Sequence, residues 1–485
     1  MPTSVRKNLA WMGVSQTFLF IIAFASSIVI ARLLTPREMG VYAIAAAIVG
    51  LLNLIRAFGL NVMVVRERSL SVQDIRTIFT VNVFINMLSS AVIFATGSAC
   101  SRFFGDAGIA NTMYVLALSP LLSIFDFLPS ALLERSGKFK AIALIGSARA
   151  LVNNGLIVLL AINGFSFMSI SLAGVATSLF SVICFNVIGR HYVSFRPSLR
   201  NWRAVTKFGF QMFLLNAVGG FTGRLTDLMI GRFIDLTALG LYSRAVSMNN
   251  LLWENLHLVI GRVVFVDFAD QLRKGLSLHD SYLRIVSILT AFLWPAFTGL
   301  AILARPIVVL VYGEAWLDAA LPLAMLSLAG VLYVAVTMTH EIYTVRGEVG
   351  RQVNVEFKRN LIGSILFAAG CFGGLGWAAA SRIGDAAIII FLAKKDLERL
   401  TQTQSSEYVP IYLRSGCLTL IACGPAFLLM VACGWSEQTS FPIIFVAVLV
   451  GVASWTLGLW YLRHPLYDEI LSIARKLWTM GRGKI

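Results

Sequence analysis

Charged residues are scarce in this chain. They make up 13% of its 485 residues, whereas apolar residues make up 58%. An ordinary soluble domain carries roughly 25% charged and about 45 to 50% apolar residues. The composition therefore excludes a soluble enzyme and a disordered protein. Because about 20 apolar helical residues cross a hydrocarbon core about 30 Å thick, it predicts an all-α polytopic membrane protein.

Cysteine and histidine are also few. The six cysteines show no C-x-x-C spacing, and the five histidines form no pair at metal-ligand spacing. We interpret the cysteines as small core residues and expect no disulfide framework, no metal site and no cofactor. The G-x-x-x-x-G-K-S/T motif is missing, which excludes ATP hydrolysis by this chain.

The apolar runs predict about fourteen transmembrane helices. The expected spans are 9–31, 40–65, 77–99, 111–133, 141–162, 167–188, 208–230, 239–261, 285–304, 320–339, 360–375, 377–393, 411–433 and 441–462. Gly373, Gly374 and Gly376 make a tight break between the eleventh and twelfth spans. The first span is too long for the apolar region of a signal peptide, so we expect a retained helix.

The net charge of +16 is distributed unevenly between the two sides of the membrane. Thirty Lys and Arg residues fall on the side of the N-terminus and five on the opposite side. This asymmetry predicts that both termini are cytoplasmic. Anionic membrane lipids account for the basic surface, so we expect no nucleic-acid partner. The short outer loops leave no room for a catalytic domain, so we expect no enzyme.

Several residues recur at offsets of 200 to 210. The pairs are Arg32 and Arg232, Gly40 and Gly240, Tyr42 and Tyr242, Gly105 and Gly313, and Gly137 and Gly347. Because the offset spans six helices, the two copies enter the membrane in the same orientation. We predict two parallel six-helix lobes, at 1–195 and 196–400, followed by two extra helices and a cytoplasmic tail at 401–485. Such a pair suits alternating access, although a duplicated scaffold would show the same pattern.

The run from Ala31 to Tyr42, with the Gly59-Leu60 turn, resembles the opening signature of Wzx-type polysaccharide flippases. The element Gly313 to Trp316 resembles their second-lobe G-x-x-W element. These flippases belong to the multidrug/oligosaccharidyl-lipid/polysaccharide (MOP) exporter superfamily, with lipid II flippases and multidrug extruders. Within it, the chain is most similar to exporters of acidic exopolysaccharides such as succinoglycan.

This resemblance implies a transporter fold in the bacterial cytoplasmic (inner) membrane. The implied cargo is an undecaprenyl-pyrophosphate-linked oligosaccharide, moved to the periplasmic leaflet for exopolysaccharide or surface-polysaccharide assembly. Membrane lipids, a polysaccharide polymerase and export machinery are the implied partners. The matching residues Pro36 and Gly40 lie at a helix boundary, where we expect them to shape the turn.

Five arginines lie inside the predicted spans. On insertion scales, a charged side chain at the centre of a membrane helix costs about 2.5 kcal/mol of free energy or more. Guanidinium groups stay charged when desolvated and bind phosphate oxygens bidentately. We therefore predict that Arg56, Arg149, Arg224 and Arg382 line a cavity and receive the pyrophosphate at successive depths.

Three of the five arginines also have a simpler interpretation. Arg224 and Arg382 each precede an aspartate by three residues, Asp227 and Asp385, so each pair can neutralise itself on one helix face. The fifth arginine, Arg244, is close enough to a span end to extend toward the outer interface.

Polar residues within the spans suggest contacts with ions or sugars. Coupling to H⁺ or Na⁺ would need desolvated carboxyl groups, since burial favours their protonated form. The candidates for ion coupling are Asp126, Asp227, Glu254 and Glu341, together with Asn250, which shares one face of the eighth span with Glu254 and His257. That face is equally suited to an interhelical hydrogen-bond seam. Asn153 and Asn154 are candidates for sugar contacts or for bonds between helices.

Two other functions compete with the flippase. A multidrug extruder of the same superfamily would export cations and favour an acidic cavity, which the five arginines oppose. An integral-membrane polysaccharide polymerase or ligase would need a large outer loop with catalytic residues, and no such loop is present in the sequence.

Overall fold

The structure is a computed structural model that describes residues 21–56, 58–67, 70–189, 196–200, 202–436, 439–467 and 471. Within these ranges, the side chains of 214–219, 222, 254–259 and 262 are not described. The described residues form helices joined by short turns, with no strand among them. This confirms the expected all-α class.

Compact packing divides the chain into two units, one ending at Gly240 and the other beginning at Leu241. The first unit contains an apolar helix at Ile21–Leu33, then α2 (Pro36–Leu52), η1 (Asn53–Arg56), α3 (Leu60–Arg66), α4 (Val72–Phe104), α5 (Ala107–Leu116), α6 (Leu118–Arg135), α7 (Phe139–Ile162), α8 (Met168–Gly189) and α9 (Trp202–Phe233).

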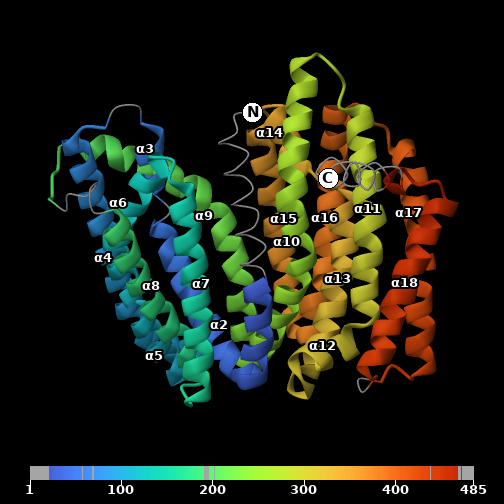
Figure 1. The fold of residues 1–485 in the computed structure, drawn as a ribbon, viewed down its shortest axis with the longest axis horizontal. Helices are drawn as coiled ribbons and strands as arrows, with labels where there is room; N and C mark the ends of the chain where they lie inside the picture. The colour runs from blue at the N-terminus through green and yellow to red at the C-terminus, as the bar shows by residue number, and fades with distance from the viewer. Residues whose placement is uncertain are drawn as a thin grey trace, which may run out of the picture. The chain divides into compact units, whose positions relative to one another are not determined.

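The unit boundary lies inside α10 (Leu236–Arg273). The second unit continues with α11 (His279–Ile302), α12 (Ala304–Tyr312), η3 (Glu314–Ala319), α13 (Ala320–Ala335), α14 (Thr339–Val345), α15 (Val349–Phe372), α16 (Leu375–Thr401), α17 (Ser405–Ala432) and α18 (Phe441–Tyr461). Figure 1 shows these helices as coiled ribbons coloured along the chain.

Within the residues that the structure describes, ten helical segments are long and apolar enough to cross a membrane. They are Pro36–Arg66, Val72–Phe104, Ala107–Arg135, Phe139–Ile162, Met168–Gly189, His279–Ile302, Glu314–Val345, Leu375–Thr401, Ser405–Ala432 and Phe441–Tyr461. The long helices α9, α10 and α15 are not among the ten. A polytopic membrane protein is therefore confirmed, and the count of fourteen spans stays a prediction.

The break predicted between the eleventh and twelfth spans is confirmed. Helix α15 ends at Phe372 and α16 begins at Leu375, with Gly374 at a φ of +93°. A residue with a Cβ is strained at such a φ, which explains the glycine. Helix α15 begins eleven residues earlier than expected because its first half carries Arg351, Lys358 and Arg359, which an apolar window does not detect.

The repeat inferred from sparse sequence matches is visible in the backbone. Gly105 and Gly313 both end a helix at positive φ, and Gly137 and Gly347 both lie in the turn before the next helix, again at positive φ. Glycine is the residue that adopts this conformation without a Cβ clash. The sequence matches therefore mark turns that both copies need.

The packing order of the helices repeats as well. In the first unit α7 packs on α8, α8 on α6, and α6 on α4. In the second unit α15 packs on α16, α16 on α13, and α13 on α11. Helices α7 and α15 have equal lengths and begin 210 residues apart. The two copies therefore share one helix arrangement.

Helix α9 packs on α2 and α4 within the first unit (Figure 1). The sequence boundary at 195/196 places this helix in the second lobe, whereas the compact units divide at Gly240. The boundary at 195/196 follows the sequence repeat, whereas the boundary at Gly240 follows the packing of the helices. The lobe boundaries 1–195, 196–400 and 401–485 stay predictions.

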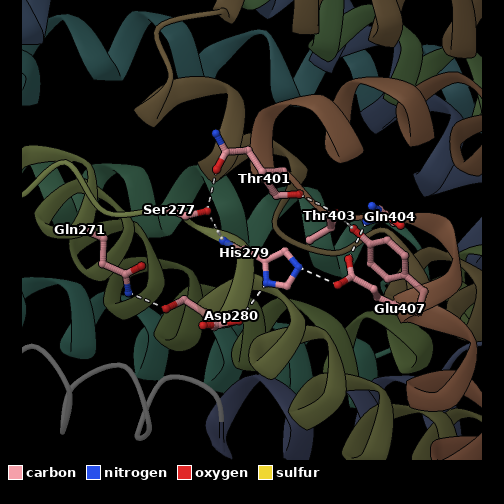
Figure 2. A network of polar contacts seen from close by, with 11 residues as sticks. Gln271, Ser277, His279, Asp280, Thr401, Thr403, Gln404 and Glu407 are labelled. Carbon is pink, nitrogen blue, oxygen red and sulfur yellow. Dashed lines mark hydrogen bonds and ion pairs between the residues drawn. The ribbon is translucent and has the colours of Figure 1, made fainter.

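The C-terminal helices are fixed to the second unit by polar contacts at the start of α11 (Figure 2). His279 Nε2 lies 2.8 Å from Glu407 Oε1 of α17, and His279 Nδ1 lies 2.8 Å from Asp280 Oδ1. Nearby, Ser277 Oγ donates to Gln402 Oε1 at 2.8 Å. Deeper in the unit, α17 packs on both α11 and α18. The two extra helices are thus an integral part of the second unit.

A buried histidine follows α18. The His464 side chain is fully buried, with Nε2 3.2 Å from Ser287 Oγ and Nδ1 accepting the Leu466 N–H at 3.2 Å. Burial, together with the positive charge of Arg414, lowers the pKa of His464 to about 4 from 6.5. The folded chain therefore holds this imidazole neutral.

We predict that acidification weakens the fold through His464. Between pH 6.5 and about 4 the unfolded chain binds a proton at this position that the folded chain does not, so stability decreases as the pH falls through this window. The thermal midpoint of the purified protein in detergent should drop between pH 7.5 and pH 5, and His464→Gln should show a smaller drop. Equal drops for both proteins would contradict this prediction.

Candidate functional site

The segment Pro36–Arg66, one of the candidate spans, is not one continuous helix. Helix α2 ends at Leu52, a 3₁₀ turn covers Asn53–Arg56, and α3 begins at Leu60 after Gly59, whose φ is +61°. Irregular backbone at membrane depth is tolerated where protein buries it or where it lines an aqueous cavity. Arg56 lies on this turn, so the first candidate residue sits at a break that needs polar partners.

Arg56 is held by two side chains from different elements. Its Nη2 donates to Ser123 Oγ of α6 at 2.6 Å, and its Nη1 lies 3.5 Å from Asn53 Oδ1. The side chain is half-buried. A guanidinium has five N–H donors. The two bonds leave donor capacity for a further acceptor.

A buried polar stripe on α4 continues this network. Asn86 Oδ1 accepts from Ser123 Oγ at 3.0 Å, Ser89 Oγ donates to Asn53 Oδ1 at 3.0 Å, and Asn86 Nδ2 donates to Asn82 Oδ1 at 2.8 Å. Asn82 is 6% exposed, and its Nδ2 has no hydrogen-bond partner within the described part of the chain. A buried donor without a partner is costly, so it marks a place for a water molecule or a ligand oxygen.

Sequence reasoning missed this stripe although a signal was available. Asn82, Asn86 and Ser89 are spaced i, i+4 and i+7, which places them on one face of α4. These three residues are neutral, so a search for charges within the spans does not detect them. The same pattern was recognised only on the eighth span.

The structure brings three of the predicted residues together. Asp126 lies in α6, three residues after Ser123, and the charges of Arg149 and Arg56 both act on its carboxyl group. Arg149, on α7, is exposed, whereas Arg56 and Asp126 are half-buried. Cations and a carboxylate from three elements thus share one polar region of the first unit.

The two predicted asparagines are engaged in hydrogen bonds. Asn153 Oδ1 accepts from Thr177 Oγ1 of α8 at 3.3 Å, and Asn154 Nδ2 donates to the Ala150 carbonyl oxygen at 2.8 Å. The Asn153 bond joins α7 to α8, as the alternative interpretation expected. Both side chains are partly exposed.

Arg224 of α9 is exposed and lies against α2. A Cβ added to Gly50 would lie 2.7 Å from Arg224 Nε, so the missing side chain makes room for this guanidinium. Asp227 is half-buried on the same helix. Asn250 is half-buried on α10, and the side chains of Glu254 and His257 lie outside the described residues.

Arg382 is clamped in the second unit. Its Nη1 lies 3.7 Å from Asp385 Oδ2, its Nε donates to Tyr242 Oη at 3.3 Å, and its guanidinium carbon lies 4.4 Å from the Phe367 ring centroid. Tyr333 donates to the same Asp385 carboxylate. The i, i+3 pairing expected from the sequence is therefore present. Partners from α10, α15 and α16 contact the arginine, and Tyr333 of α13 contacts its carboxylate partner.

Arg244 is buried among aromatic rings, and its extension toward the outer interface stays a prediction. The residue is 7% exposed, and its guanidinium carbon lies 6.0 Å from the Tyr312 ring centroid and 5.7 Å from the Trp316 ring centroid. Trp316 belongs to the G-x-x-W element. Cation–π contact with two rings compensates part of the desolvation of the charge. Arg244 thus links α10 to that element.

The second unit contains a comparable helix break that is closed by tyrosines. Between α13 and α14, Met338 has a φ of +59°. Tyr412 Oη donates to the Ala335 carbonyl oxygen at 2.7 Å, and Tyr282 Oη donates to that of Thr337 at 3.3 Å. These bonds occupy carbonyl groups that the break sets free. The break in the first unit is instead lined by arginine, asparagine and serine side chains.

These features define a class of protein, a polytopic helical membrane protein with a duplicated helix bundle and polar, arginine-containing sites at membrane depth. The chain belongs to the family described as "Polysaccharide biosynthesis protein", whose sequence model matches residues 29–321. The family confirms the resemblance stated from the Ala31 to Tyr42 run.

Individual proteins agree with this membership. The chain is 23% identical over 326 residues to the succinoglycan biosynthesis transport protein ExoT of Rhizobium meliloti, covering 67% of this chain and 66% of that protein. It is 21% identical over 361 residues to the lipopolysaccharide biosynthesis protein WzxC of Escherichia coli, covering 74% and 72%.

The fold matches that of a solved transporter. Lipid II flippase MurJ, in an inward closed conformation, superimposes with a TM-score of 0.75 at 14% identity, covering 93% of this chain and 98% of MurJ. The expected exporter fold is therefore confirmed. ExoT is named a transport protein and MurJ a flippase, so these neighbours are transporters and not enzymes.

We predict that the Arg382 clamp stabilises the second unit. Asp385→Ala leaves a largely buried guanidinium without its carboxylate, which should lower the free energy of unfolding by about 3 kcal/mol. Denaturant titration in detergent measures this difference. Asp280→Ala, at a fully exposed carboxylate, is the control and should change stability little. Equal stabilities of the two variants would refute the role of the clamp.

Proposed function

We propose that the protein is a flippase for a lipid-linked oligosaccharide in polysaccharide biosynthesis. Family membership over residues 29–321 carries this proposal. The fold shared with a lipid II flippase supports it, because lipid II is itself named as the cargo of that protein. The cargo class we propose is an undecaprenyl-pyrophosphate-linked repeat unit, moved from the cytoplasmic to the periplasmic leaflet of the bacterial inner membrane.

Transport would proceed by alternating access of the two repeats. Like-oriented repeats can expose a site to one side of the membrane and then to the other. The excess of Lys and Arg on one set of loops supports cytoplasmic termini. In that orientation α2 and α10 both begin on the outer side of the membrane. The lipid tail stays in the bilayer, so only the polar head needs a protected route.

Arg56 and Arg149 are the residues we propose for the pyrophosphate in the first unit. Arg149 is exposed, and Arg56 retains unused donors beside Ser123 and Asn53. The unpaired Asn82 Nδ2 offers a further donor to an oxygen of the cargo. Arg224 on α9 supplies a third accessible cation. Arg382, held by Asp385 and aromatic rings, fits a structural role better.

Ion coupling is a separate proposal. Asp126 is a half-buried carboxylate between two arginines, so a proton or Na⁺ arriving there would compete with the guanidinium groups. Asp227, Asn250 and Glu254 are the remaining candidates.

A polymerase that consumes the flipped repeat unit would draw transport forward, and we propose such a partner in the same membrane.

Deletion of the protein tests the function directly. We expect surface polysaccharide to disappear and the lipid-linked repeat unit to accumulate in the inner leaflet, because synthesis continues while translocation stops. Extraction of labelled lipid-linked sugars, with digestion by an enzyme added to the outer face, measures the leaflet. Unchanged polysaccharide, or a repeat unit accessible from outside, would refute the flippase.

Arginine variants test the cationic route. Because a hydrogen bond to a charged group contributes about 1.5 to 3 kcal/mol, Arg56→Ala and Arg149→Ala should each slow export about tenfold or more. Arg56→Lys keeps the charge without the paired donors and should be intermediate. Arg102→Ala removes an exposed arginine near the end of α4 and is the control. Complementation of the deletion strain gives the export rate of each variant, which is normalised to its protein level. Full activity of both alanine variants would exclude Arg56 and Arg149 from the mechanism.

A further inference from the structure

Helices α7 and α15 occupy the same place in the two repeats and carry an arginine at the same position. Arg149 is the eleventh residue of α7, and Arg359 is the eleventh residue of α15. Glycines at positive φ flank both helices at an offset of 210, Gly137 and Gly347 before them and Gly164 and Gly374 after them. The register is thus fixed on both sides, and the two arginines correspond in the repeat.

Arg359 lies within a helix. The predicted eleventh span begins at residue 360, so the sequence alone places Arg359 in a loop. In the structure it lies ten residues after the start of α15, which is about 15 Å at 1.5 Å per residue. Its side chain is 23% exposed. Arg359 is therefore a helical cation that a search for charges within the predicted spans does not detect.

Each of the two arginines acts on a side chain of the helix that corresponds in the packing order. The charge of Arg149 acts on Asp126 of α6, and the charge of Arg359 acts on the hydroxyl group of Tyr333 of α13. Tyr333 itself donates to a buried carboxylate, Asp385. Both repeats thus place this arginine near a polar side chain on the corresponding helix.

The hydrogen bonds of Arg359 leave part of its guanidinium unused. Its Nη2 donates to Asn360 Oδ1 at 3.0 Å and lies 3.1 Å from Glu356 Oε2. Its Nε is buried and has no hydrogen-bond partner among the residues that the structure describes. A guanidinium has five N–H donors, and a buried donor without a partner is costly. The Glu356 side chain is 37% exposed, so water screens its charge. An oxyanion at Nε would satisfy the donor and balance the charge.

We propose that Arg359 binds a phosphate oxygen of the lipid-linked cargo and is the counterpart, in the second repeat, of Arg149. The transport route then has a cationic position for the diphosphate in each repeat. This inference rests on the proposed flippase function. In one alternative, Arg359 serves only as the partner of Glu356, with water at Nε. In the other, it attracts anionic membrane lipids in general.

Binding of geranylgeranyl pyrophosphate tests this assignment. The ligand is titrated into purified full-length protein in a neutral detergent. This protein carries Arg56→Ala and Arg149→Ala, so that the two first-unit arginines do not contribute. Arg359→Ala should weaken binding of the diphosphate about tenfold, because a hydrogen bond between charged groups is lost. Binding of geranylgeraniol, which lacks the diphosphate, should be unchanged.

Lys358→Ala is the matched control, because it removes the same charge from the neighbouring, exposed residue. This variant should bind the diphosphate as tightly as the protein with Lys358. Equal losses in Arg359→Ala and Lys358→Ala would show general electrostatic attraction and overturn the proposal. Displacement of the diphosphate by an equal concentration of phosphatidylglycerol would assign the site to membrane lipids and overturn it too.

Glu356→Gln separates ligand binding from a structural role. Because Glu356 competes for the same guanidinium, its neutralisation should tighten binding of the diphosphate several-fold. The gain should disappear when Arg359 is also replaced by alanine. Arg359→Lys keeps the charge without the Nε donor and should bind with intermediate affinity. These two variants decide the question even if Arg359→Ala fails to fold, and unchanged or weaker binding by Glu356→Gln would overturn the proposal.

Export distinguishes failure of this inference from failure of the proposed function. In the deletion strain, Arg359→Ala should restore export about tenfold more slowly than the parent protein at equal protein level. Lys358→Ala should restore it fully. Full export by Arg359→Ala would overturn the role of Arg359 alone, whereas normal polysaccharide in the deletion strain itself would refute the flippase.

Discussion

The cost of an unsatisfied polar group in hydrocarbon is the constraint on which this structure depends. A membrane interior offers no water to a free carbonyl or to a charge, so protein groups must take its place. Arg382 shows this with Asp385 and the Phe367 ring, and Arg244 shows it with the rings of Tyr312 and Trp316. In both cases protein groups take the place of water around the charge: aromatic rings at Arg244, and a carboxylate and an aromatic ring at Arg382.

The charged groups of the first unit have different partners. At its helix break Arg56 bonds to a serine and an asparagine, and the charges of Arg56 and Arg149 act on the Asp126 carboxyl group. The Asn82 amide nitrogen, farther along the network, has no partner in the described structure. Partial satisfaction is expensive in a rigid core. An acceptor oxygen placed beside Asn82 Nδ2 would remove this cost.

Composition and charge asymmetry were enough to predict an all-helical membrane protein, and a few glycines were enough to predict its repeat. Gly105 and Gly313 recur because a positive φ favours glycine, so this backbone requirement is visible although the two repeats share few identical residues. Partners of the intramembrane charges could not be predicted in the same way. Tyr333 and Asp385 are 52 residues apart in the chain, and periodicity along one helix does not reveal which neighbour it meets.

Gly40 and Gly240 show that a local backbone requirement can involve both repeats. Gly40 was expected to permit close approach at a helix start, and the chain that approaches is the corresponding turn of the other repeat. A duplicated sequence can form such a contact with itself, because each copy presents the same carbonyl and the same bare Cα to its counterpart. A substitution at either glycine must therefore leave room for the carbonyl group of the other repeat.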